Sequence, residues 1–457
     1  MLRRIQNLPL QWVLALVSFI SIIVISYLKT SLELEDAEQA YYSQWWRWGY
    51  DDQPPLYTWL QKVINAIFGV TKFSFSFLRG IFFAATLLAL YEFAEKILKD
   101  SFKAHLVVLS SLLIPVFIDF TFRRLSHTLL LCLVVLLTLN VVARLIKRRD
   151  FRDYVLLGIC FGVGMLSKYN YAFFLLAVIA TSFFDLTIRH VFWNKKILVS
   201  YSIAFILFLP HLYWYTTKSY FRNVQESVYI KLGIEADGTI IFTPLLESIK
   251  TLFDISAPFA LVFILLFLSK IVQWRKEERS SWLFKLMIVQ LLLLVLCFIL
   301  INIQDVQTRW LLPLVLPYIV VFMKSIDINK KNIKKTGIVL FLLIIMFQVL
   351  RTPVERFLGI FSAVHFDYGQ LSKKLNTDYS DAVWILPNVT YGGQIKLLNP
   401  DKELFTLDDF SIPDSRKIDK NHVVVSNLKN VFENIQPKDS ILNYGPDKEN
   451  IYIFQKN

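Results

Sequence analysis

Cysteine and glycine are scarce in this sequence of 457 residues, which contains 3 Cys and 14 Gly. All three cysteines (Cys132, Cys160 and Cys297) lie inside apolar runs, which argues against a disulfide framework. A glycine-rich phosphate-binding loop, a dinucleotide fingerprint and a zinc-protease helix are all absent. The segment 162–168 contains Gly, Ser and Lys but is not such a loop, because it lies within an apolar run. The sequence therefore offers no motif for nucleotide binding or zinc catalysis.

What the sequence does contain is a succession of long apolar runs. Hydrophobic residues make up 55% of the chain, and the mean hydropathy is +0.49. Apolar runs of about 17–20 residues recur, which is the length that crosses a hydrocarbon core of roughly 30 Å. We therefore predict an all-α polytopic membrane protein with about eleven transmembrane helices. The predicted spans are 10–29, 77–97, 104–122, 126–144, 153–167, 169–187, 197–215, 254–272, 283–302, 310–325 and 336–352.

The positions of the basic residues orient these spans. The formal net charge is +13, but many lysines and arginines lie in short links between apolar runs, which indicates membrane orientation rather than nucleic-acid binding. If Arg3 and Arg4 are cytoplasmic, every further link on that side is basic. These links lie at 96–103, 144–152, 189–196, 270–285 and 324–335. The opposite side receives the acidic stretch 33–38, the loop at 216–250 and the tail. No small-residue cleavage site follows the first apolar run, so it is predicted to remain as a span.

The tail differs in kind from the rest of the chain. Short β-rich stretches, such as 383–386 and 423–425, alternate there with polar turns. We predict a transmembrane domain at 1–352 and a small C-terminal α/β domain at 353–457, on the non-cytoplasmic side.

The first outer loop, predicted at 30–76, carries the densest group of polar residues. Its apolar segment at 57–70 is too short to cross the bilayer, and we expect it to lie along the interface or to pack against the bundle. A carboxylate cluster near a membrane suits a general base or a metal ligand. The same residues also fit a solvated acidic loop beside an interfacial aromatic belt. The cluster comprises Glu35, Asp36, Glu38, Tyr41, Tyr42, Trp45, Trp46, Trp48, Asp51, Asp52 and Gln53.

A second polar cluster lies where one predicted span ends. Asp119, Arg123 and Arg124 stand in otherwise apolar sequence, and a charge at the centre of a span costs roughly 2.5–3.5 kcal/mol. Such charges must be paired or hydrated, which suits a substrate pocket. Arginines that extend to the lipid headgroups would give the same pattern.

Two further cationic residues reach the same side from other spans. Lys168 and Tyr169 follow a span in which Gly158 and Gly162 allow close helix packing, and Arg309 begins a later span beside a tryptophan. Both cations suit the capture of a lipid phosphate. Ordinary anchoring at the interface explains them equally well from sequence alone. Four polar clusters on one side indicate chemistry on a lipid-borne substrate.

Four segments of the chain, in their order along the sequence, resemble the motifs of a known superfamily. They lie at 35–42, 48–60, 162–170 and 309–313. This superfamily is the GT-C glycosyltransferases, specifically the bacterial relatives of protein O-mannosyltransferases and lipid A aminoarabinose transferases. The resemblance extends over residues 10–350 and does not include the tail. At one point the chain departs from the family, because here Glu precedes Asp at the start of the loop, whereas the family usually has Asp before Glu.

The resemblance implies a reaction and roles for particular residues. Members of the family are helical membrane bundles that move a sugar from a polyprenyl phosphate to an acceptor, usually with inversion at the anomeric carbon. By this resemblance Asp36 or Glu35 activates the acceptor hydroxyl. Lys168 and Arg309 stabilise the departing lipid phosphate. The substrate pocket is expected to include Glu38, Tyr41, Tyr42, Gln53, Asp119, Arg123, Arg124 and Tyr169.

The expected partners follow from this reaction. They are a polyprenyl-phosphate sugar donor, a lipid, glycan or protein acceptor, and the lipid bilayer, with no nucleic acid. A divalent metal is compatible with Glu35, Asp36 and Asp119 but is not required, because these carboxylates also suit pairing with Arg123. We expect a protein of a bacterial inner membrane whose site faces the periplasm or exterior. The alternative is a transporter or flippase of a lipid-linked substrate, which the lack of an internal repeat and the one-sided polar clusters disfavour.

Overall fold

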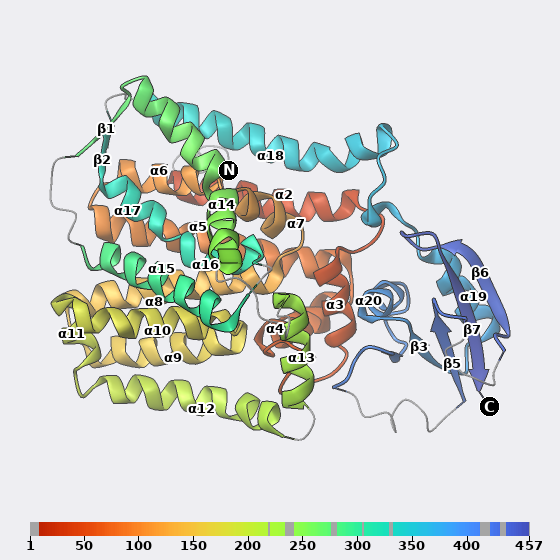
Figure 1. The fold of residues 1–457 in the computed structure, drawn as a ribbon. Coiled ribbons are helices and arrows are strands. Elements are labelled where there is room, and N and C mark those ends of the chain that lie inside the picture. The colour runs from red at the N-terminus through yellow and green to blue at the C-terminus, as the bar shows by residue number, and fades with distance from the viewer. Residues whose placement is uncertain are drawn as a thin grey trace. The chain divides into compact units, whose positions relative to one another are not determined.

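The computed structural model is mostly helical (Figure 1). It describes residues 9–217, 220–233, 242–275, 281–303, 306–328, 332–411, 421–429 and 436–456. The helices are α2 (Leu10–Leu28), α3 (Leu34–Tyr42), α4 (Leu56–Phe68), α5 (Lys72–Leu98), α6 (Ser101–Ser111), a π-helix (Val116–Phe120), α7 (Thr121–Arg123), α8 (Ser126–Lys147), α9 (Phe151–Ser167), α10 (Asn170–Phe184), α11 (Leu186–Phe192), α12 (Ile197–Thr216), α13 (Tyr220–Leu232), α14 (Phe242–Leu268), α15 (Trp282–Ile301), α16 (Thr308–Val315), α17 (Tyr318–Lys324), α18 (Ile333–Phe357), α19 (Gly369–Asp378) and α20 (Val389–Leu398), with a 3-10 turn at Ala363–His365. The strands are β1 (Val272–Trp274), β2 (Ile326–Ile328), β3 (Val383–Leu386), β4 (Leu404–Thr406), β5 (His422–Ser426), β6 (Asp439–Tyr444) and β7 (Glu449–Lys456).

The chain forms two compact units, each assembled from segments that are distant in sequence. The helical unit comprises Met1–Phe19, Asp52–Pro54 and Ile81–Met346. The other comprises Ile20–Asp51, Pro55–Gly80 and Phe347–Asn457. We call the second the loop–tail unit, because it combines most of the predicted first outer loop with the C-terminal residues.

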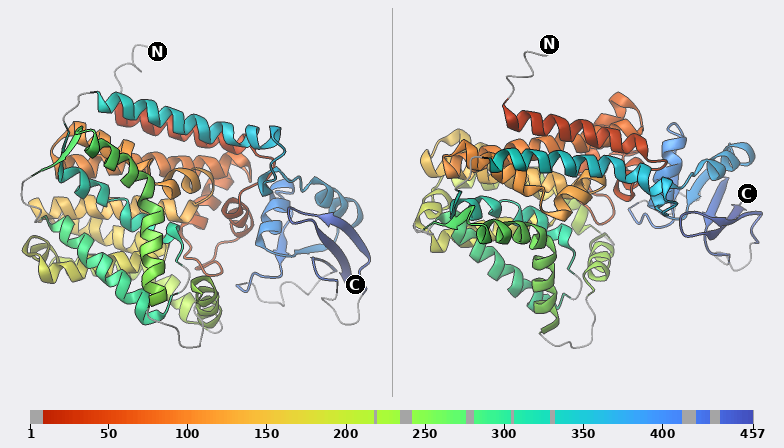
Figure 2. Two further views of the ribbon diagram at one scale, coloured as in Figure 1. Left: turned by 45° about the horizontal axis from the view of Figure 1, so that its top comes forward. Right: turned by 90° about the horizontal axis from the view of Figure 1, so that it is seen from above.

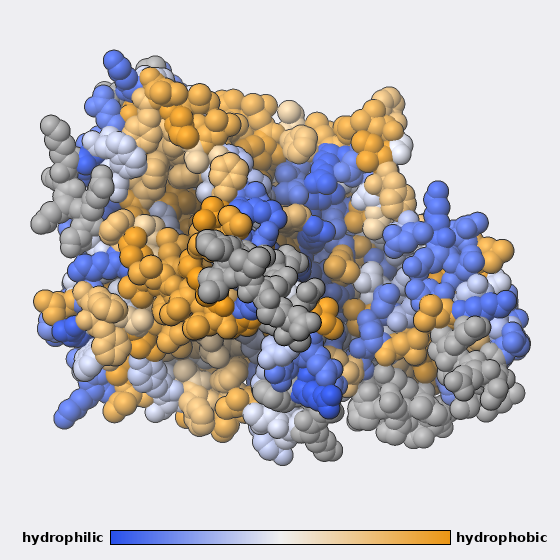
Figure 3. All heavy atoms as spheres, in the orientation of Figure 1, coloured by the Kyte–Doolittle hydropathy of each residue, from blue (hydrophilic) through white to orange (hydrophobic). Residues whose placement is uncertain are grey.

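Long apolar helices confirm the prediction of a polytopic membrane protein. Among the described residues, seven helices are long and apolar enough to cross a bilayer, or up to nine if two bent helix pairs each count as one span. The seven are α2, α5, α8, α12, α14, α15 and α18, of which α2 and α18 lie side by side in both views of Figure 2. Figure 3 shows apolar side chains over α14 and α15, and on α15 Leu292, Leu296 and Leu300 are exposed at intervals of one turn. Such a stripe suits contact with lipid. The count of eleven spans and the side of the membrane on which the loops lie remain predictions.

Three of the predicted spans are not straight helices. The segment predicted at 104–122 is α6 followed by the π-helix and α7, bent by 75°, and Pro115 at the break lacks the amide donor that would continue the ladder. α10 and α11 are bent by 117° at Asp185, whose carboxylate caps α11. The segment predicted at 310–325 is divided into α16 and α17 at Pro317. Proline and the capping carboxylate account for these breaks, because both compete with the helical hydrogen-bond ladder.

Glycines bring α9 and α12 into close contact. A Cβ added to Gly158 would lie 2.7 Å from the carbonyl oxygen of Ser200, and a Cβ added to Gly162 would lie 2.7 Å from the side chain of Leu207. The prediction that these small residues allow close packing is therefore confirmed for this helix pair.

Gly158→Val should destabilise the protein by about 1–3 kcal/mol, because the added side chain forces the two helix backbones apart. Thermal denaturation of the purified protein in detergent micelles measures the effect. Gly337→Ala is a suitable control, since the nearest atom to its Cβ would be the flexible end of the Leu109 side chain at 3.0 Å rather than backbone. A Gly158→Val midpoint equal to that of the wild type would contradict the expectation.

A five-stranded sheet forms the centre of the C-terminal part of the loop–tail unit. Its strand order is β4-β3-β5-β7-β6. β3 pairs in parallel with β4 and β5, whereas β5, β7 and β6 pair antiparallel. This sheet, together with α19 and α20, confirms the predicted small C-terminal domain. Its hydrophobic core contains Trp384 and Ile395 and also Tyr41, Tyr42 and Tyr50 of the first outer loop, so the loop and the tail share one core.

Candidate active site

The predicted site residues form two sets, one in each unit. The helical unit contains Gln53, Asp119, Arg123, Arg124, Lys168, Tyr169 and Arg309. The loop–tail unit contains Glu35, Asp36, Glu38, Tyr41 and Tyr42. The first set is mainly cationic, and the second is acidic and aromatic.

Lys168 lies at the junction of α9 and α10, where the backbone is extended. Its half-buried side chain donates a hydrogen bond from Nζ to Thr128 Oγ1, in the first turn of α8, at 2.9 Å. Next to it, Tyr169 shares a hydrogen bond of 3.2 Å with Nε2 of the buried His211, and the two rings stack. The hydrogen bond to Thr128 therefore holds the Lys168 ammonium group at the start of α8.

Arg309 lies in the first turn of α16, and a hydrogen bond ties this turn to the Lys168 junction. Asn170 Nδ2 donates to the carbonyl oxygen of Trp310 at 3.2 Å. Within the described part of the chain, Arg309 Nε is buried and has no hydrogen-bond partner. Buried donors are normally satisfied, so this nitrogen is well suited to bind an anionic ligand. Gln304 and Asp305, which belong to the same sequence cluster, lie outside the described residues.

Asp119, Arg123 and Arg124 lie on the π-helix, on α7 and directly after α7. Arg123 is 6% exposed, and the Arg124 guanidinium lies over the Phe120 ring at 4.4 Å. α16 packs against both this π-helix and α8. The fold thus brings the predicted arginine segment, the Lys168 segment and the Arg309 helix together around the start of α8.

Asp52 is a residue of this region that the site prediction did not include. Its carboxylate accepts a hydrogen bond from Ser227 Oγ at 2.9 Å and forms an ion pair with Lys231, both on α13. The predicted pocket residue Gln53, half-buried, follows Asp52 directly. The sequence did mark Asp52 as part of an acidic pair shortly before two prolines. Its contacts with α13 could not be predicted, because α13 lies about 175 residues further along the chain.

The predicted catalytic carboxylates lie in the first turn of α3, a helix of nine residues. Glu35 is 9% exposed and Asp36 is 3% exposed, while Glu38 is half-buried. Acidic side chains are favourable in the first turn because the helix dipole is positive there. The opposite end of α3 is held by α4, where Lys62 Nζ donates to the carbonyl oxygens of Ser43 and Gln44 at 3.1 and 2.9 Å.

Asp36 forms a buried ion pair with Arg79 of α5. Arg79 Nη1 donates to Asp36 Oδ1 at 2.5 Å, and the two side chains are 1% and 4% exposed. Burial raises the pKa of Asp36 above its ordinary value of 3.8, and the Arg79 guanidinium opposes this shift. The ion pair therefore fixes the orientation of the Asp36 carboxylate in the first turn of α3. Arg79 was not among the predicted site residues.

Tyr41 and Tyr42, the predicted site tyrosines of the loop–tail unit, are anchored by carboxylates of the same unit. The Tyr41 hydroxyl donates to Asp409 Oδ2 at 2.9 Å, and the Tyr42 hydroxyl donates to Asp51 Oδ2 at 3.0 Å. Burial, followed by the charge of the accepting carboxylate, raises the pKa of each phenol well above 10.0, so both stay protonated. Both tyrosines therefore serve as hydrogen-bond donors and core residues in this structure.

Among the described residues, no group of three or more His, Cys, Asp or Glu side chains is placed to hold a metal ion. Glu35 and Asp36 belong to one unit and Asp119 to the other.

Comparison with known proteins gives consistent matches. Residues 52–214 match the family described as dolichyl-phosphate-mannose-protein mannosyltransferase. The chain is 24% identical over 405 residues to the lipopolysaccharide core galacturonosyltransferase RgtA of Rhizobium johnstonii, covering 86% of this chain and 81% of that protein. It is 26% identical over 290 residues to RgtB of the same organism, covering 62% of this chain and 58% of RgtB.

Solved structures show the same fold. ArnT from Cupriavidus metallidurans bound to undecaprenyl phosphate aligns with a TM-score of 0.61 and 11% identity, over 96% of this chain and 97% of that one. The apo form of the same protein aligns with a TM-score of 0.56 over the same shares of the two chains.

The fold and these matches define an integral membrane glycosyltransferase. These matches support the resemblance to the GT-C superfamily of membrane glycosyltransferases that the order of its motifs predicted. The alternative of a transporter or flippase is not favoured, since the matched proteins are glycosyltransferases.

Proposed function

We propose that this glycosyltransferase moves a sugar from a polyprenyl-phosphate donor to a lipid, glycan or protein acceptor, with inversion at the anomeric carbon. The active site faces the outer side of a bacterial inner membrane. The solved relative that contains undecaprenyl phosphate supports a polyprenyl donor. The relatives named as lipopolysaccharide core galacturonosyltransferases support a uronic acid among the first sugars to test and a surface lipid among the first acceptors.

The observation that carries this proposal is the gathering of cations around the start of α8. Lys168 is bonded to Thr128, and the α16 turn that bears Arg309 is bonded to Asn170. An arginine fork whose buried Nε has no hydrogen-bond partner among the described residues suits a phosphate group, and a lysine adds a second point charge. These groups would stabilise the charge that develops on the departing lipid phosphate.

The acidic residues of α3 would provide the base that activates the acceptor hydroxyl. In the proposed step the Asp36 carboxylate accepts the proton of the acceptor hydroxyl while that oxygen forms a bond to the anomeric carbon. The bond between the anomeric carbon and the phosphate oxygen breaks, and its electron pair remains on the lipid phosphate. Glu35 lies beside Asp36 and is the alternative base. Arg79 keeps Asp36 oriented through the 2.5 Å hydrogen bond.

The proposed function is tested by sugar transfer from radiolabelled polyprenyl-phosphate sugars by the purified protein. The donors are galacturonic acid, mannose and aminoarabinose derivatives, each offered with and without a membrane-lipid extract as acceptor. Transfer that requires both protein and extract supports the proposal. Donors that stay intact with every acceptor, or that only move between leaflets of a vesicle, would overturn it.

Lys168→Met and Arg309→Ala should each weaken binding of a polyprenyl phosphate by roughly 10- to 100-fold, because a charge-assisted hydrogen bond is worth about 1.5–3 kcal/mol. Binding is measured by displacement of a labelled polyprenyl phosphate in detergent. Arg222→Ala is the matched control, since Arg222 is exposed on α13 and forms a surface ion pair with Glu226 one turn along the same helix. Unchanged affinity in both variants would remove these cations from the phosphate site.

A further inference from the structure

We propose that the C-terminal domain is a positioning element for glycosyl transfer, because it holds the helix that carries Glu35 and Asp36. This inference rests on the proposed function, which assigns those carboxylates to the reaction. All contacts that carry it lie within the loop–tail unit. They join residues 32–47 to residues 392–411, which are more than 340 residues apart in the sequence.

The first contact is a close approach of two helices. A Cβ added to Gly393 on α20 would lie 1.8 Å from the carbonyl oxygen of Ala37 on α3, and a Cβ added to Gly392 would lie 2.9 Å from the Tyr41 ring. Ala37 directly follows Asp36 in the helix. The backbone of α20 therefore touches the backbone of α3 at the position of the carboxylates, and only glycine fits there.

The second contact consists of paired hydrogen bonds from two side-chain amides, one before α3 and one after it. Before the helix, the buried Gln394 side chain donates to the carbonyl oxygen of Leu32 at 2.8 Å and accepts from its N–H at 3.0 Å. After the helix, the Gln44 amide accepts from the N–H of Leu404 at 3.2 Å and donates to its carbonyl oxygen at 3.4 Å. Leu404 begins β4, an edge strand of the sheet. Both ends of α3 are thus bonded to the tail through paired hydrogen bonds.

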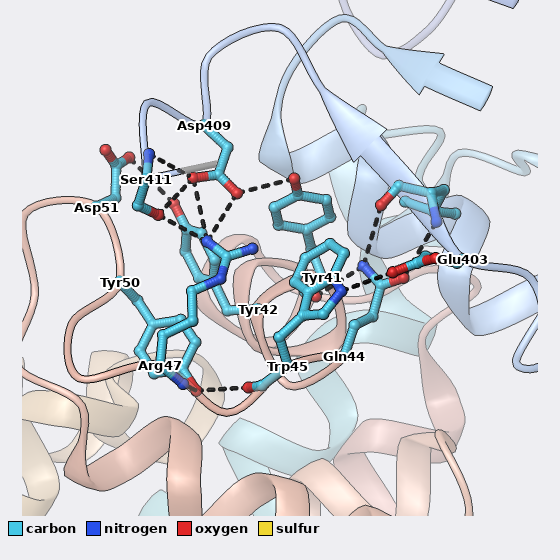
Figure 4. A network of polar contacts seen from close by, with 11 residues as sticks. Tyr41, Tyr42, Gln44, Trp45, Arg47, Tyr50, Asp51, Glu403, Asp409 and Ser411 are labelled. Carbon is cyan, nitrogen blue, oxygen red and sulfur yellow. Dashed lines mark hydrogen bonds and ion pairs between the residues drawn. The ribbon is translucent and has the colours of Figure 1, made fainter. Parts of the chain in front are cut away.

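The third contact is a buried charge network at Asp409, which Figure 4 shows from close by. The Asp409 side chain is 0% exposed and accepts from Arg47 Nη1 at 3.0 and 3.2 Å. It also accepts from the Tyr41 hydroxyl at 2.9 Å and from Ser411, through Oγ at 2.6 Å and the backbone N–H at 3.0 Å. One carboxylate of the tail therefore ties the last turn of α3 to the segment that follows it.

These three contacts fix α3 at its middle and at both ends. The tail has no match in the predicted motifs and contributes no residue to the predicted site, yet it determines where the α3 backbone lies. A misplacement of about 1 Å at a catalytic group can cost roughly 10²-fold in rate. The geometry points to Gly393, Gln394 and Asp409 as positioning residues for the first-loop carboxylates.

The test compares Gly393→Ala and Asp409→Ala with wild-type full-length protein in the transfer assay. Each variant should lower kcat at least tenfold and leave the KM for the donor within about twofold, because the phosphate-binding cations belong to the other unit. Asp409→Asn keeps an oxygen acceptor for Tyr41 and Arg47 and should recover part of the lost rate. The matched control is Gly369→Ala in the same domain, where the atoms nearest to the new Cβ belong to the Asp367 side chain and not to the backbone.

A spin label reports the position of α3 directly. Leu34, the first residue of α3, is 47% exposed and can carry the label as Leu34→Cys, in a background where Cys132, Cys160 and Cys297 are alanine. The label should become more mobile in Asp409→Ala and in Gly393→Ala, and should be unchanged in Gly369→Ala. This readout stands even if one variant folds poorly, since the other tests the same helix through a different contact.

The outcomes separate this inference from the proposed function. A lower kcat, an unchanged KM and a more mobile label support the positioning role. Wild-type turnover in Gly393→Ala and Asp409→Ala, with Asp36→Asn and Glu35→Gln inactive, overturns the positioning role and leaves the proposed function intact. Wild-type turnover in all four variants overturns the assignment of the carboxylates and the inference that rests on it.

Discussion

Asp36→Asn should lower kcat by roughly 10²–10⁴-fold, which is the range for removal of a general base. The amide keeps the size of the side chain and one oxygen that can accept from Arg79, so the fold of α3 should persist. It loses the ability to take the proton of the acceptor hydroxyl. The measurement is kcat for transfer from a polyprenyl-phosphate sugar to its acceptor, with circular dichroism and size-exclusion chromatography to establish that the variant is folded.

Glu35→Gln is the matched comparison, because the two residues are neighbours in the first turn of α3 and are both buried. We expect a smaller loss for Glu35→Gln, since the structure pairs Asp36 with Arg79 and raises the pKa of Asp36. A larger loss at Glu35 would transfer the role of the base to that residue. Full activity in both variants would remove the first-loop carboxylates from the reaction.

Arg79→Met should reduce kcat by about 10²-fold or more and move the acid limb of the pH profile to higher pH. Burial already raises the pKa of Asp36, and the Arg79 charge and hydrogen bond are what hold it down. Without them the pKa rises further, so the carboxylate stays protonated over a wider range at low pH. A base must be deprotonated to act, and kcat should therefore fall as the pH decreases through this raised pKa. The measurement is kcat against pH for the two proteins.

The double variant Asp36→Asn/Arg79→Met is the control for stability. Arg79→Met alone leaves a buried carboxylate without its partner, which costs about 3–5 kcal/mol where the carboxylate is ionised. Removing the charge of both partners should cost less, because no uncompensated ion is left. An Arg79→Met enzyme with the wild-type pH profile and the wild-type denaturation midpoint would show that the ion pair does not tune Asp36.

The class of fold was predictable because it depends on local properties of the chain. A run of about 17–20 apolar residues has few alternatives to a membrane helix. The short apolar segment after the first span was expected to be too short to cross, and it forms α4, a helix of 13 residues. The bends at Pro115 and Asp185 were missed because hydropathy does not register a proline or a capping carboxylate inside an apolar run.

The partners of the site residues could not be predicted, because they are distant in sequence. Arg79 is 43 residues from Asp36, and Asp409 is 368 residues from Tyr41. One signal for Arg79 was available, since an arginine inside an apolar span is costly and usually has a functional partner. For Asp409 no signal existed, since it stands in a polar tail among many other charges.

The hydrogen bonds between α3 and the tail also bear on the order of events during synthesis of the protein. Leu32 and Gln394 are 362 residues apart, so the ribosome makes the first outer loop long before it makes the amide that binds it. At about 5–20 residues per second this interval is roughly 20–70 s. During that time the segment that contains α3 lacks its hydrogen bonds to Gln394, while later spans of the chain are still being inserted. If the C-terminal domain positions α3 as proposed, a nascent chain that ends before Gln394 should insert into the membrane and lack transfer activity.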